Sequence, residues 1–362
     1  MKGYLVIEDG TIYKGIAFGA EGERYGELIF NTSMTGYQEI IYDPSYKGQI
    51  VVMTYPLIGN YGINSEDVQS YKIHLEGFVI REKSKIYSNW RAEKSIDELF
   101  KENGIIGIED VDTRKITEIL RDKGAQKAGI FTGDHEPKEM LDKVRKSPSI
   151  IGRDIVKEVI REKPYIWKNE GKYKVVVIDC GVKYNILRLL SKFDLKVFVY
   201  PATTPYEEIE KEKPDGILIS NGPGDPEPLT YVIKNVSNLI EKYPIFGICL
   251  GHQILGQVFG GRTYKLKFGH HGANHPVKEL KTGKIYITVQ NHGFCVDINT
   301  IKDPNIEITH INLNDFTLEG IEHKKLPVFS VQFHPENAPG PRDAEYLFEK
   351  FYKYIEKNAK KD

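Results

Sequence analysis

The stretch FGICLGHQ, residues 246–253, joins an apolar run to a tight turn and then to a helical pattern. Ile245 to Ile248 is typical of a buried strand, and a helix is expected to begin directly after Cys249. Glycines on both sides of Cys249 suit a turn in which side chains would clash. This is the arrangement of a nucleophile elbow, with cysteine in place of serine. It predicts a sheet that presents Cys249 at its carboxyl edge.

The chemistry expected of Cys249 follows from that turn. A helix N-terminus favours thiolate over thiol, and the N–H of Leu250 is placed to stabilise an oxyanion. A lone buried cysteine is more often a core residue, but the two glycines favour a nucleophile. Cys180 and Cys295 lack flanking glycines of this kind and are predicted to be structural.

The residues around this turn alternate between strands and helices. Residues 175–178, 195–200 and 217–219 are apolar runs of the kind that forms buried parallel strands. Thr204-Pro205-Tyr206-Glu207 resembles a capping box, and a helix is expected over 229–243. Residues 173–362 therefore predict an open, mostly parallel sheet flanked by helices, with a final helix over 344–357.

The first 150 residues have a different pattern, which predicts a mixed α/β domain with strands and a few helices. Asp9-Gly10 is a hairpin turn signal between two strand patterns. Ser95 is a candidate helix N-cap, and a helix over 113–123 is expected to end at Gly124. Residues 151–172 are charged and contain proline, which indicates a linker.

The composition excludes several functions. The chain has 362 residues, with 50 basic and 51 acidic side chains and a net charge of −1, so nucleic acid is not the expected partner. No apolar run is long enough to span a membrane. Three cysteines do not form a disulfide framework and fit a reducing cytoplasm.

A second motif, SVQFHPE over 330–336, supplies the base that a cysteine nucleophile needs. Residues two apart on an extended segment share a face, so Glu336 can orient His334. A solvated histidine beside a surface glutamate is the plain alternative. The preceding apolar run and the presence of Cys249 favour the catalytic interpretation.

Other polar stretches leave alternatives open. SNGPGDP, residues 220–226, is either a binding loop with exposed backbone donors or an ordinary turn, and it is not a phosphate loop. QNHGF, residues 290–294, looks like a turn and is an equal candidate for a substrate loop.

Several histidines outside the 330–336 motif are not expected to carry chemistry. His252 is not expected to reach the sulfur of Cys249. His270, His271 and His275 have the spacing of helical metal ligands, but the surrounding glycines and proline argue against a helix and a metal site.

Together, GICLGHQ, NGPGDP and QFHPE resemble the class I (triad) glutamine amidotransferases over about 173–358. The other half resembles the N-terminal domain of carbamoyl-phosphate synthetase small subunits. The residues that carry this second resemblance are 30–39, 43–46, 54–62 and 269–276.

The resemblance implies a glutaminase. Cys249 would attack the side-chain amide of L-glutamine, His334 would move the proton, and Glu336 would orient His334. A glutamyl thioester would form and be hydrolysed to glutamate, releasing ammonia. The implied oxyanion hole is the N–H groups of Gly222 and Leu250. The further residues implied to bind glutamine are Ser45, Gly224, Gln253, Asn291, Gly293 and Phe294.

The resemblance also implies a partner. A large subunit, in a heterodimer or higher oligomer, would use ATP, Mg²⁺ and bicarbonate to make carbamoyl phosphate for arginine and pyrimidine biosynthesis. No cofactor is expected in this chain. Three alternatives are a glutaminase serving anthranilate or GMP synthesis, a non-catalytic regulatory subunit and a cysteine peptidase. The N-terminal motifs argue against the other glutaminases. The intact Cys249 and His334 argue against a regulatory subunit, and the 220–226 loop argues against a peptidase.

Overall fold

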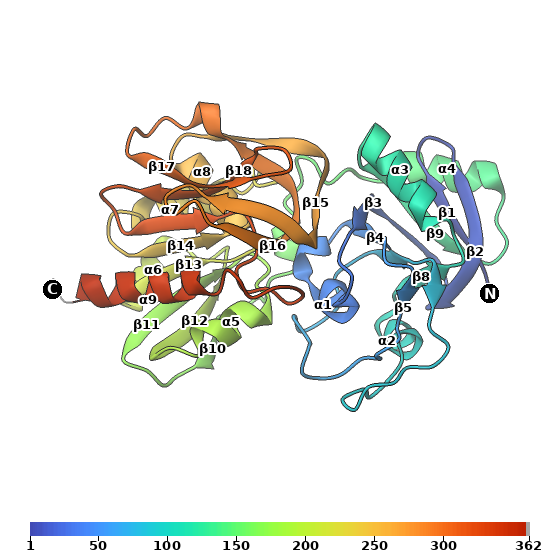
Figure 1. Cartoon of the computed structure of the whole chain (residues 1–362), viewed down its shortest axis with the longest axis horizontal. Helices are drawn as coiled ribbons and strands as arrows, with labels where there is room; N and C mark the ends of the chain where they lie inside the picture. The colour runs from blue at the N-terminus through green and yellow to red at the C-terminus, as the bar shows by residue number, and fades with distance from the viewer. Residues whose placement is uncertain (360–362) are drawn as a thin grey trace. The chain divides into compact units, whose positions relative to one another are not determined.

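The computed structural model describes residues 1–359, which form two compact units (Figure 1). The first contains Met1–Arg153 and Lys267–Gly272. The second contains Asp154–Leu266 and the chain from Ala273 onward. Most of the expected linker, 151–172, falls in the second unit. The domain boundaries drawn from the sequence place Lys267–Gly272 with residues 173–362, whereas in the structure this segment belongs to the first unit.

The first unit is built on a closed barrel of strands. The hairpin expected around Asp9-Gly10 is its first strand pair. Around the barrel, the strands follow the order β1 (Lys2–Ile7), β2 (Ile12–Gly19), β8 (Ile106–Glu109), β6 (Gly77–Val79), β4 (Gln49–Met53), β3 (Glu23–Asn31) and β9 (Gln126–Thr132). Because the barrel is closed, none of its seven strands is an edge strand that could pair with another chain.

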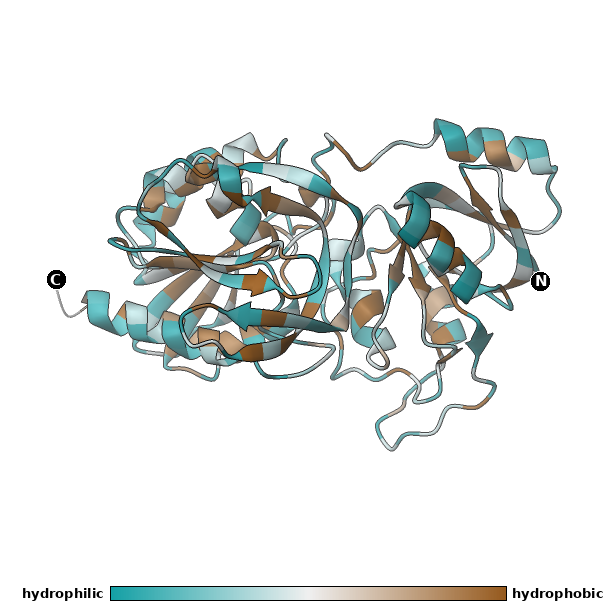
Figure 2. Ribbon diagram, turned by 45° about the horizontal axis from the view of Figure 1, so that its top comes forward, coloured by the Kyte–Doolittle hydropathy of each residue, from teal (hydrophilic) through white to brown (hydrophobic). Residues whose placement is uncertain are grey.

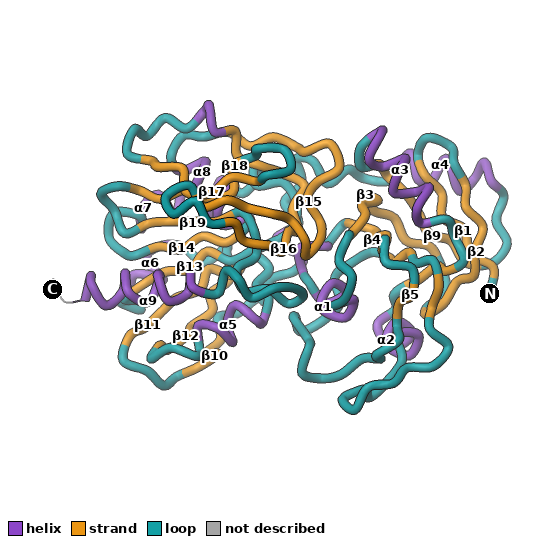
Figure 3. Tube along the Cα trace, viewed as in Figure 1, coloured by secondary structure: helices purple, strands orange, loops and turns teal. Residues whose placement is uncertain are grey.

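Side chains alternate between two cores along the barrel strands, as the period of a strand requires. On β4, Ile50 and Val52 belong to one buried cluster, and Val51 and Met53 to another. The helices of this unit are α1 (Tyr37–Tyr42), α2 (Ile96–Asn103), α3 (Thr113–Lys123) and α4 (Pro137–Lys146), with the short strands β5 (Leu57–Ile58) and β7 (Glu82–Lys83). Residues 59–76 consist mostly of turns and bends (Figure 3).

Two predictions for the first unit are confirmed at residue level. Helix α3 has the predicted bounds and ends at Gly124, whose φ of 97° favours glycine. Ser95 caps α2 by accepting from the N–H of Glu98, and Glu98 reciprocates as in a capping box.

A single sheet organises the second unit, and within the described residues it has ten strands. Their order is β10 (Tyr165–Lys168), β12 (Leu195–Pro201), β11 (Tyr173–Asp179), β13 (Gly216–Ile219), β14 (Ile245–Ile248), β19 (Val328–Val331), β18 (Leu318–His323), β17 (Ile306–Asn312), β15 (Arg262–Glu279) and β16 (Ile285–Asp297). From β12 to β19 the neighbours run parallel. The strand pair β18 and β19 is antiparallel. The parallel part places the ends of β13, β14 and β19 at one edge.

Helices cover both faces of this sheet, which is why the strand β11 is apolar at successive positions. Val175 and Val177 pack in the cluster that includes α5 (Tyr184–Leu190) and α9 (Tyr346–Ala359). Val176 and Ile178 pack on the other face, with α6 (Tyr206–Lys211), α7 (Thr230–Leu239) and α8 (Leu250–Val258). In Figure 2, α9 alternates between hydrophilic and hydrophobic segments, as expected of a helix with one buried face.

The predicted capping box at residues 204–207 is wrong. Helix α6 begins at Tyr206, Pro205 occupies the N-cap position, and the N–H of Tyr206 donates to Oδ1 of Asn235 at 3.3 Å. Instead, Thr204 closes a turn through its N–H to Pro201, and its carbonyl accepts from Asn235. These tertiary contacts override the local signal. Helix α7 also ends earlier than predicted, at Leu239.

In residues 1–359, no helix is long and apolar enough to cross a membrane.

The capping box of α2 gives a local stability prediction. Ser95→Ala removes the acceptor for the Glu98 N–H and should cost about 1 kcal/mol. Amide hydrogen exchange within α2 should then be about fivefold faster. Ser95→Asp keeps a capping acceptor and should leave exchange nearly unchanged. Equal exchange in the Ser95→Ala variant and the wild type would show that the cap does not stabilise α2.

Candidate active site

Cys249 lies in the turn between β14 and α8, in a backbone conformation rarely adopted by residues with side chains. Its φ is 53° and its ψ is −101°. A Cβ added at Gly251 would lie 2.3 Å from the carbonyl oxygen of Ile219, and one at Gly247 would lie 2.7 Å from that of Gly251. Both glycines are therefore needed for close contact between α8 and the strand ends. The structure has the strand, turn and helix predicted from residues 246–253.

The sulfur of Cys249 is held between a carbonyl acceptor and an amide donor. Its Sγ donates to the carbonyl of Asn291 at 3.6 Å. In turn, Nε2 of Gln332 donates to Sγ at 3.7 Å. Cys249 is only 1 % exposed, so these contacts replace solvent around the sulfur.

His334 and Glu336 form the predicted pair. Nδ1 of His334 donates to Oε1 of Glu336 at 2.6 Å, and both side chains are buried. Burial alone would lower the pKa of His334, but the charge of Glu336 and then that of Cys249 outweigh it and raise the pKa. Nε2 of His334 has no hydrogen-bond partner in residues 1–359, so it is the ring nitrogen available for proton exchange.

Lys183 is a charged member of the site that the sequence patterns did not indicate. Its Nζ lies 2.9 Å from Oε1 of Glu336, and the Lys183 side chain is 1 % exposed. Burial would raise the pKa of Glu336, but the charges of Lys183 and His334 outweigh it and lower the pKa. Glu336 is therefore a carboxylate held between two cationic groups. Lys183 follows strand β11, so its place at the carboxyl edge of the sheet was the available signal.

The residue after Glu336 helps to fix Lys183. Asn337 has a φ of 53°, and its carbonyl accepts from Nζ of Lys183 at 2.6 Å. The side chain of Asn337 donates to Glu345 at 2.9 Å. Asn185 donates to the backbone carbonyl of Glu336. The chain around the carboxylate is thus anchored by side chains just before α5, on α5 and just before α9.

The proposed oxyanion donors occupy sites suited to backbone N–H groups. Leu250 is the first residue of α8, where an N–H has no acceptor within its own helix. A Cβ at Gly222 would lie 2.2 Å from the carbonyl oxygen of Cys180, so the 220–226 loop packs tightly there. The Oδ1 of Asn221 accepts from the N–H of Lys183 at 3.1 Å. This loop is a fixed part of the site's framework.

The remaining residues expected to bind glutamine are distributed between the units. In the second, Gly224 has a φ of 83° in its loop, and Gln253 lies on α8. Residues 290–294, expected to form a turn, instead belong to β16, so Asn291, Gly293 and Phe294 lie on a strand. This expectation was wrong because the polar residues are satisfied inside the sheet. Ser45 belongs to the first unit, in the 3-10 helix Pro44–Tyr46, where its N–H donates to Asp43.

The other cysteines and His252 have surroundings typical of structural residues. Burial raises the pKa of Cys180 well above its usual value and that of Cys295 to about 12. Nδ1 of His252 lies 2.9 Å from Oγ of Ser330. Burial, with a smaller effect of His310, lowers the pKa of His252 to about 3. Cys180, Cys295 and His252 are therefore not assigned catalytic roles, which stay with Cys249, His334 and Glu336.

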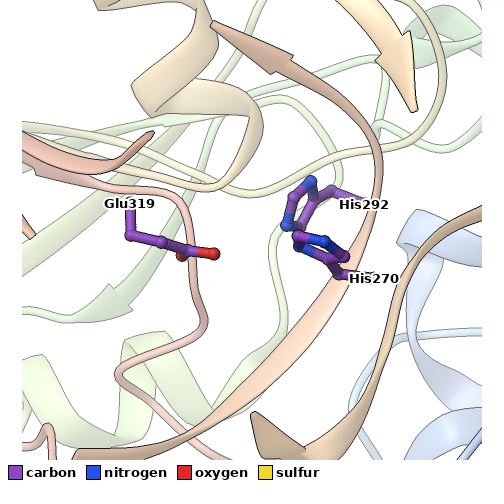
Figure 4. Close-up of side chains that lie close together, drawn as sticks. All are labelled: His270, His292 and Glu319. Atoms are coloured by element: carbon purple, nitrogen blue, oxygen red, sulfur yellow. The ribbon is translucent and has the colours of Figure 1, made fainter. Parts of the chain in front are cut away.

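The histidines with helical metal-ligand spacing lie on a strand. His270, His271 and His275 are all part of β15, where residues four apart are separated by about 13 Å. Figure 4 shows His270, which belongs to the first unit, and two side chains of the second unit, His292 and Glu319. The Glu319 carboxylate points toward the His292 ring.

Gln290 connects the two side chains of the second unit. It donates to Glu319 at 2.9 Å, and its Oε1 lies 3.0 Å from Nε2 of His292. Nδ1 of His292 lies 2.8 Å from the carbonyl of Phe294. This buried hydrogen-bond network thus connects Glu319 to the stretch of β16 that contains Asn291.

Comparisons with known proteins identify the family of this chain. Residues 176–354 match the model of the glutamine amidotransferase class-I family, and residues 5–130 match that of the carbamoyl-phosphate synthase small chain, CPSase domain. Proteins called carbamoyl phosphate synthase small chain from Syntrophotalea carbinolica and Aquifex aeolicus are each 53 % identical to this chain. The alignments cover 99 % of both chains for the first, and 96 % of this chain and 97 % of the relative for the second. A protein of the same name from Thermotoga maritima is 48 % identical over 98 % of each chain. The chain belongs to the carbamoyl phosphate synthase small chain family.

Proposed function

We propose that this chain hydrolyses L-glutamine through Cys249 and supplies the ammonia to a large chain that makes carbamoyl phosphate. The observation that carries the proposal is the strained turn that presents Cys249 beside a buried His334 and Glu336, in a chain of this family. Each group has the chemistry that the reaction requires.

The first half of the reaction forms a thioester. The Cys249 thiolate attacks the amide carbon, and the N–H groups of Gly222 and Leu250 stabilise the negative oxygen. The raised pKa of His334 keeps its ring protonated beside the thiolate. As the tetrahedral intermediate collapses, His334 gives this proton to the leaving nitrogen, so ammonia departs and the glutamyl thioester remains.

The second half regenerates the Cys249 thiolate and protonated His334. Neutral His334 takes a proton from water as the water oxygen attacks the thioester carbon. Collapse of this second intermediate breaks the carbon–sulfur bond and releases glutamate. Throughout, Glu336 holds Nδ1 of His334 and balances its charge, and Lys183 keeps Glu336 ionised.

The proposed partner follows from the family. A small chain implies a large chain, which would bind ATP, Mg²⁺ and bicarbonate and receive the ammonia. We propose a heterodimer as the smallest working assembly. We also propose that Ser45, Gly224, Gln253, Asn291, Gly293 and Phe294 hold the amino-acid end of glutamine.

Cys249→Ser tests the nucleophile. A serine hydroxyl is much less ionised than a thiol, so glutamine-dependent carbamoyl phosphate synthesis by the complex should fall about a thousandfold or more. Synthesis from added ammonia should persist because the large chain is intact. Assays with each nitrogen source measure the two activities. If both activities fell together, Cys249 would not have the proposed role.

Lys183→Met tests the cation beside Glu336. Because Lys183 lowers the pKa of Glu336, its removal should raise that pKa, so the acidic limb of the glutaminase pH profile should move to higher pH. The stability that ionised Glu336 contributes would also be lost at higher pH than in the wild type. Lys192→Met, which removes a solvent-exposed partner of Glu345, is the matched control and should leave the profile in place. An unmoved acidic limb in Lys183→Met would contradict the assignment.

Glutaminase activity measured with and without the large chain tests the partnership. The isolated chain should be slow, and stoichiometric large chain should raise its turnover because the two reactions are coupled. The release of glutamate measures both rates. Equal rates with and without the large chain would refute the coupling but leave the hydrolysis itself standing.

A further inference from the structure

We infer that Gln332 is a positioning residue that donates an N–H to the Cys249 sulfur, and that Gln253 and the Phe294 carbonyl fix the direction of this donor. The inference rests on the proposed role of Cys249 and adds to it a hydrogen-bond relay. All four residues lie in the second unit, and their side chains are buried.

The direction of the relay is set at the Phe294 carbonyl. A carbonyl oxygen only accepts, so the amide nitrogen of Gln253 must face it, at 2.8 Å. The same Nε2 lies 3.1 Å from the Gln332 side chain, which must therefore present its oxygen Oε1 to Gln253. This leaves the Gln332 amide nitrogen facing Sγ of Cys249, at 3.7 Å. Rotating either amide by half a turn would set two oxygens or two N–H groups against each other.

The backbone holds both amides in place. Gln253 lies one helical turn after Cys249, and its N–H donates to the Cys249 carbonyl at 3.1 Å. The N–H of Gln332 donates to the carbonyl of Glu319 at 2.9 Å, on strand β18. The donor at the sulfur is thus attached to the sheet on one side and to α8 on the other.

A fixed N–H donor favours the thiolate. A neutral thiol is a weak acceptor, whereas a hydrogen bond to an ionised acceptor is about twice as strong as a neutral one. Gln332 therefore stabilises the charged form more than the thiol. Once the thioester forms, the sulfur loses its charge, so the contact assists ionisation without binding the intermediate tightly.

The relay is compatible with the proposed contact of Gln253 with substrate. Both hydrogens of its amide group are used by Phe294 and Gln332. Its oxygen Oε1 takes no part in either of these bonds and can accept from the ammonium group of glutamine. Gln253 can hold the substrate and still keep the Gln332 donor in place.

The test is the pH dependence of Cys249 alkylation by iodoacetamide in the full chain, without glutamine, followed by mass spectrometry of the Cys249 peptide. Gln332→Met keeps the side-chain length but removes the donor. The pH midpoint of alkylation should rise by about one unit, which is about tenfold slower reaction below the midpoint. Gln332→Glu has the shape of glutamine but presents oxygens to the sulfur. It should raise the pH midpoint of alkylation by at least as much as Gln332→Met does.

Two further variants separate the relay from general disturbance. Gln253→Met should raise the midpoint by less, and adding it to Gln332→Met should cause no further rise, because both act through one donor. Gln257→Met makes the same change one turn further along α8, where the side chain contacts Thr263, and should leave the midpoint unchanged.

The outcomes distinguish this inference from the proposed function. If Cys249 in the wild type reacted no faster than Cys180 and Cys295, the nucleophile assignment itself would fail. A reactive Cys249 whose midpoint is the same in wild type, Gln332→Met and Gln332→Glu would overturn the relay alone. Additive shifts in the double variant, or an equal shift in Gln257→Met, would also overturn it.

Discussion

The close contact between the start of α8 and the end of β13 is the constraint on which the site depends. It exists because Gly251 has no Cβ, which would lie 2.3 Å from the carbonyl oxygen of Ile219. This contact lets the chain reverse at Cys249 with a positive φ, at a cost of about 1–3 kcal/mol that the surrounding sheet must offset. The reversal directs the sulfur out of the sheet edge and begins a helix directly after it. The N–H of Leu250 and the relay through Gln253 both depend on that helix start.

Charge at the site is balanced by buried groups alone. A carboxylate removed from water costs several kcal/mol unless it is paired, and Glu336 is fully buried. Lys183 and His334 both contact its Oε1, so the carboxylate stays ionised and His334 is cationic before the attack. With the Cys249 thiolate, the group contains two negative and two positive charges. The protonation state needed for attack is therefore nearly neutral overall, which limits the cost of burying it.

Sequence patterns predicted those parts of the molecule that depend on local spacing. The Cys249 turn, the pairing of His334 with Glu336 and the bounds of α3 could be read from residues close together in the chain. Lys183 could not, because its partner Glu336 is far away in sequence and only the parallel order of β11, β13, β14 and β19 brings the two together. The failed capping box at Thr204 has a related cause, since a contact with Asn235 on another helix decides how α6 begins. Residues 290–294 were mistaken for a turn because their polar side chains are satisfied inside the sheet, by one another along β16 and by Glu319 on β18.

The two contacts of the Cys249 sulfur favour opposite protonation states. The carbonyl of Asn291 can accept only from the thiol and would repel a thiolate. The amide of Gln332 donates, and so it favours the thiolate. Neither contact moves a proton, so His334 is the group that exchanges the proton with the sulfur. Asn291 and Phe294 both lie on β16, so the strand proposed to bind glutamine also carries the acceptor of the thiol and the carbonyl that orients the relay. Glutamine bound along β16 would therefore act on the ionisation of the nucleophile as well as on the position of its own amide carbon.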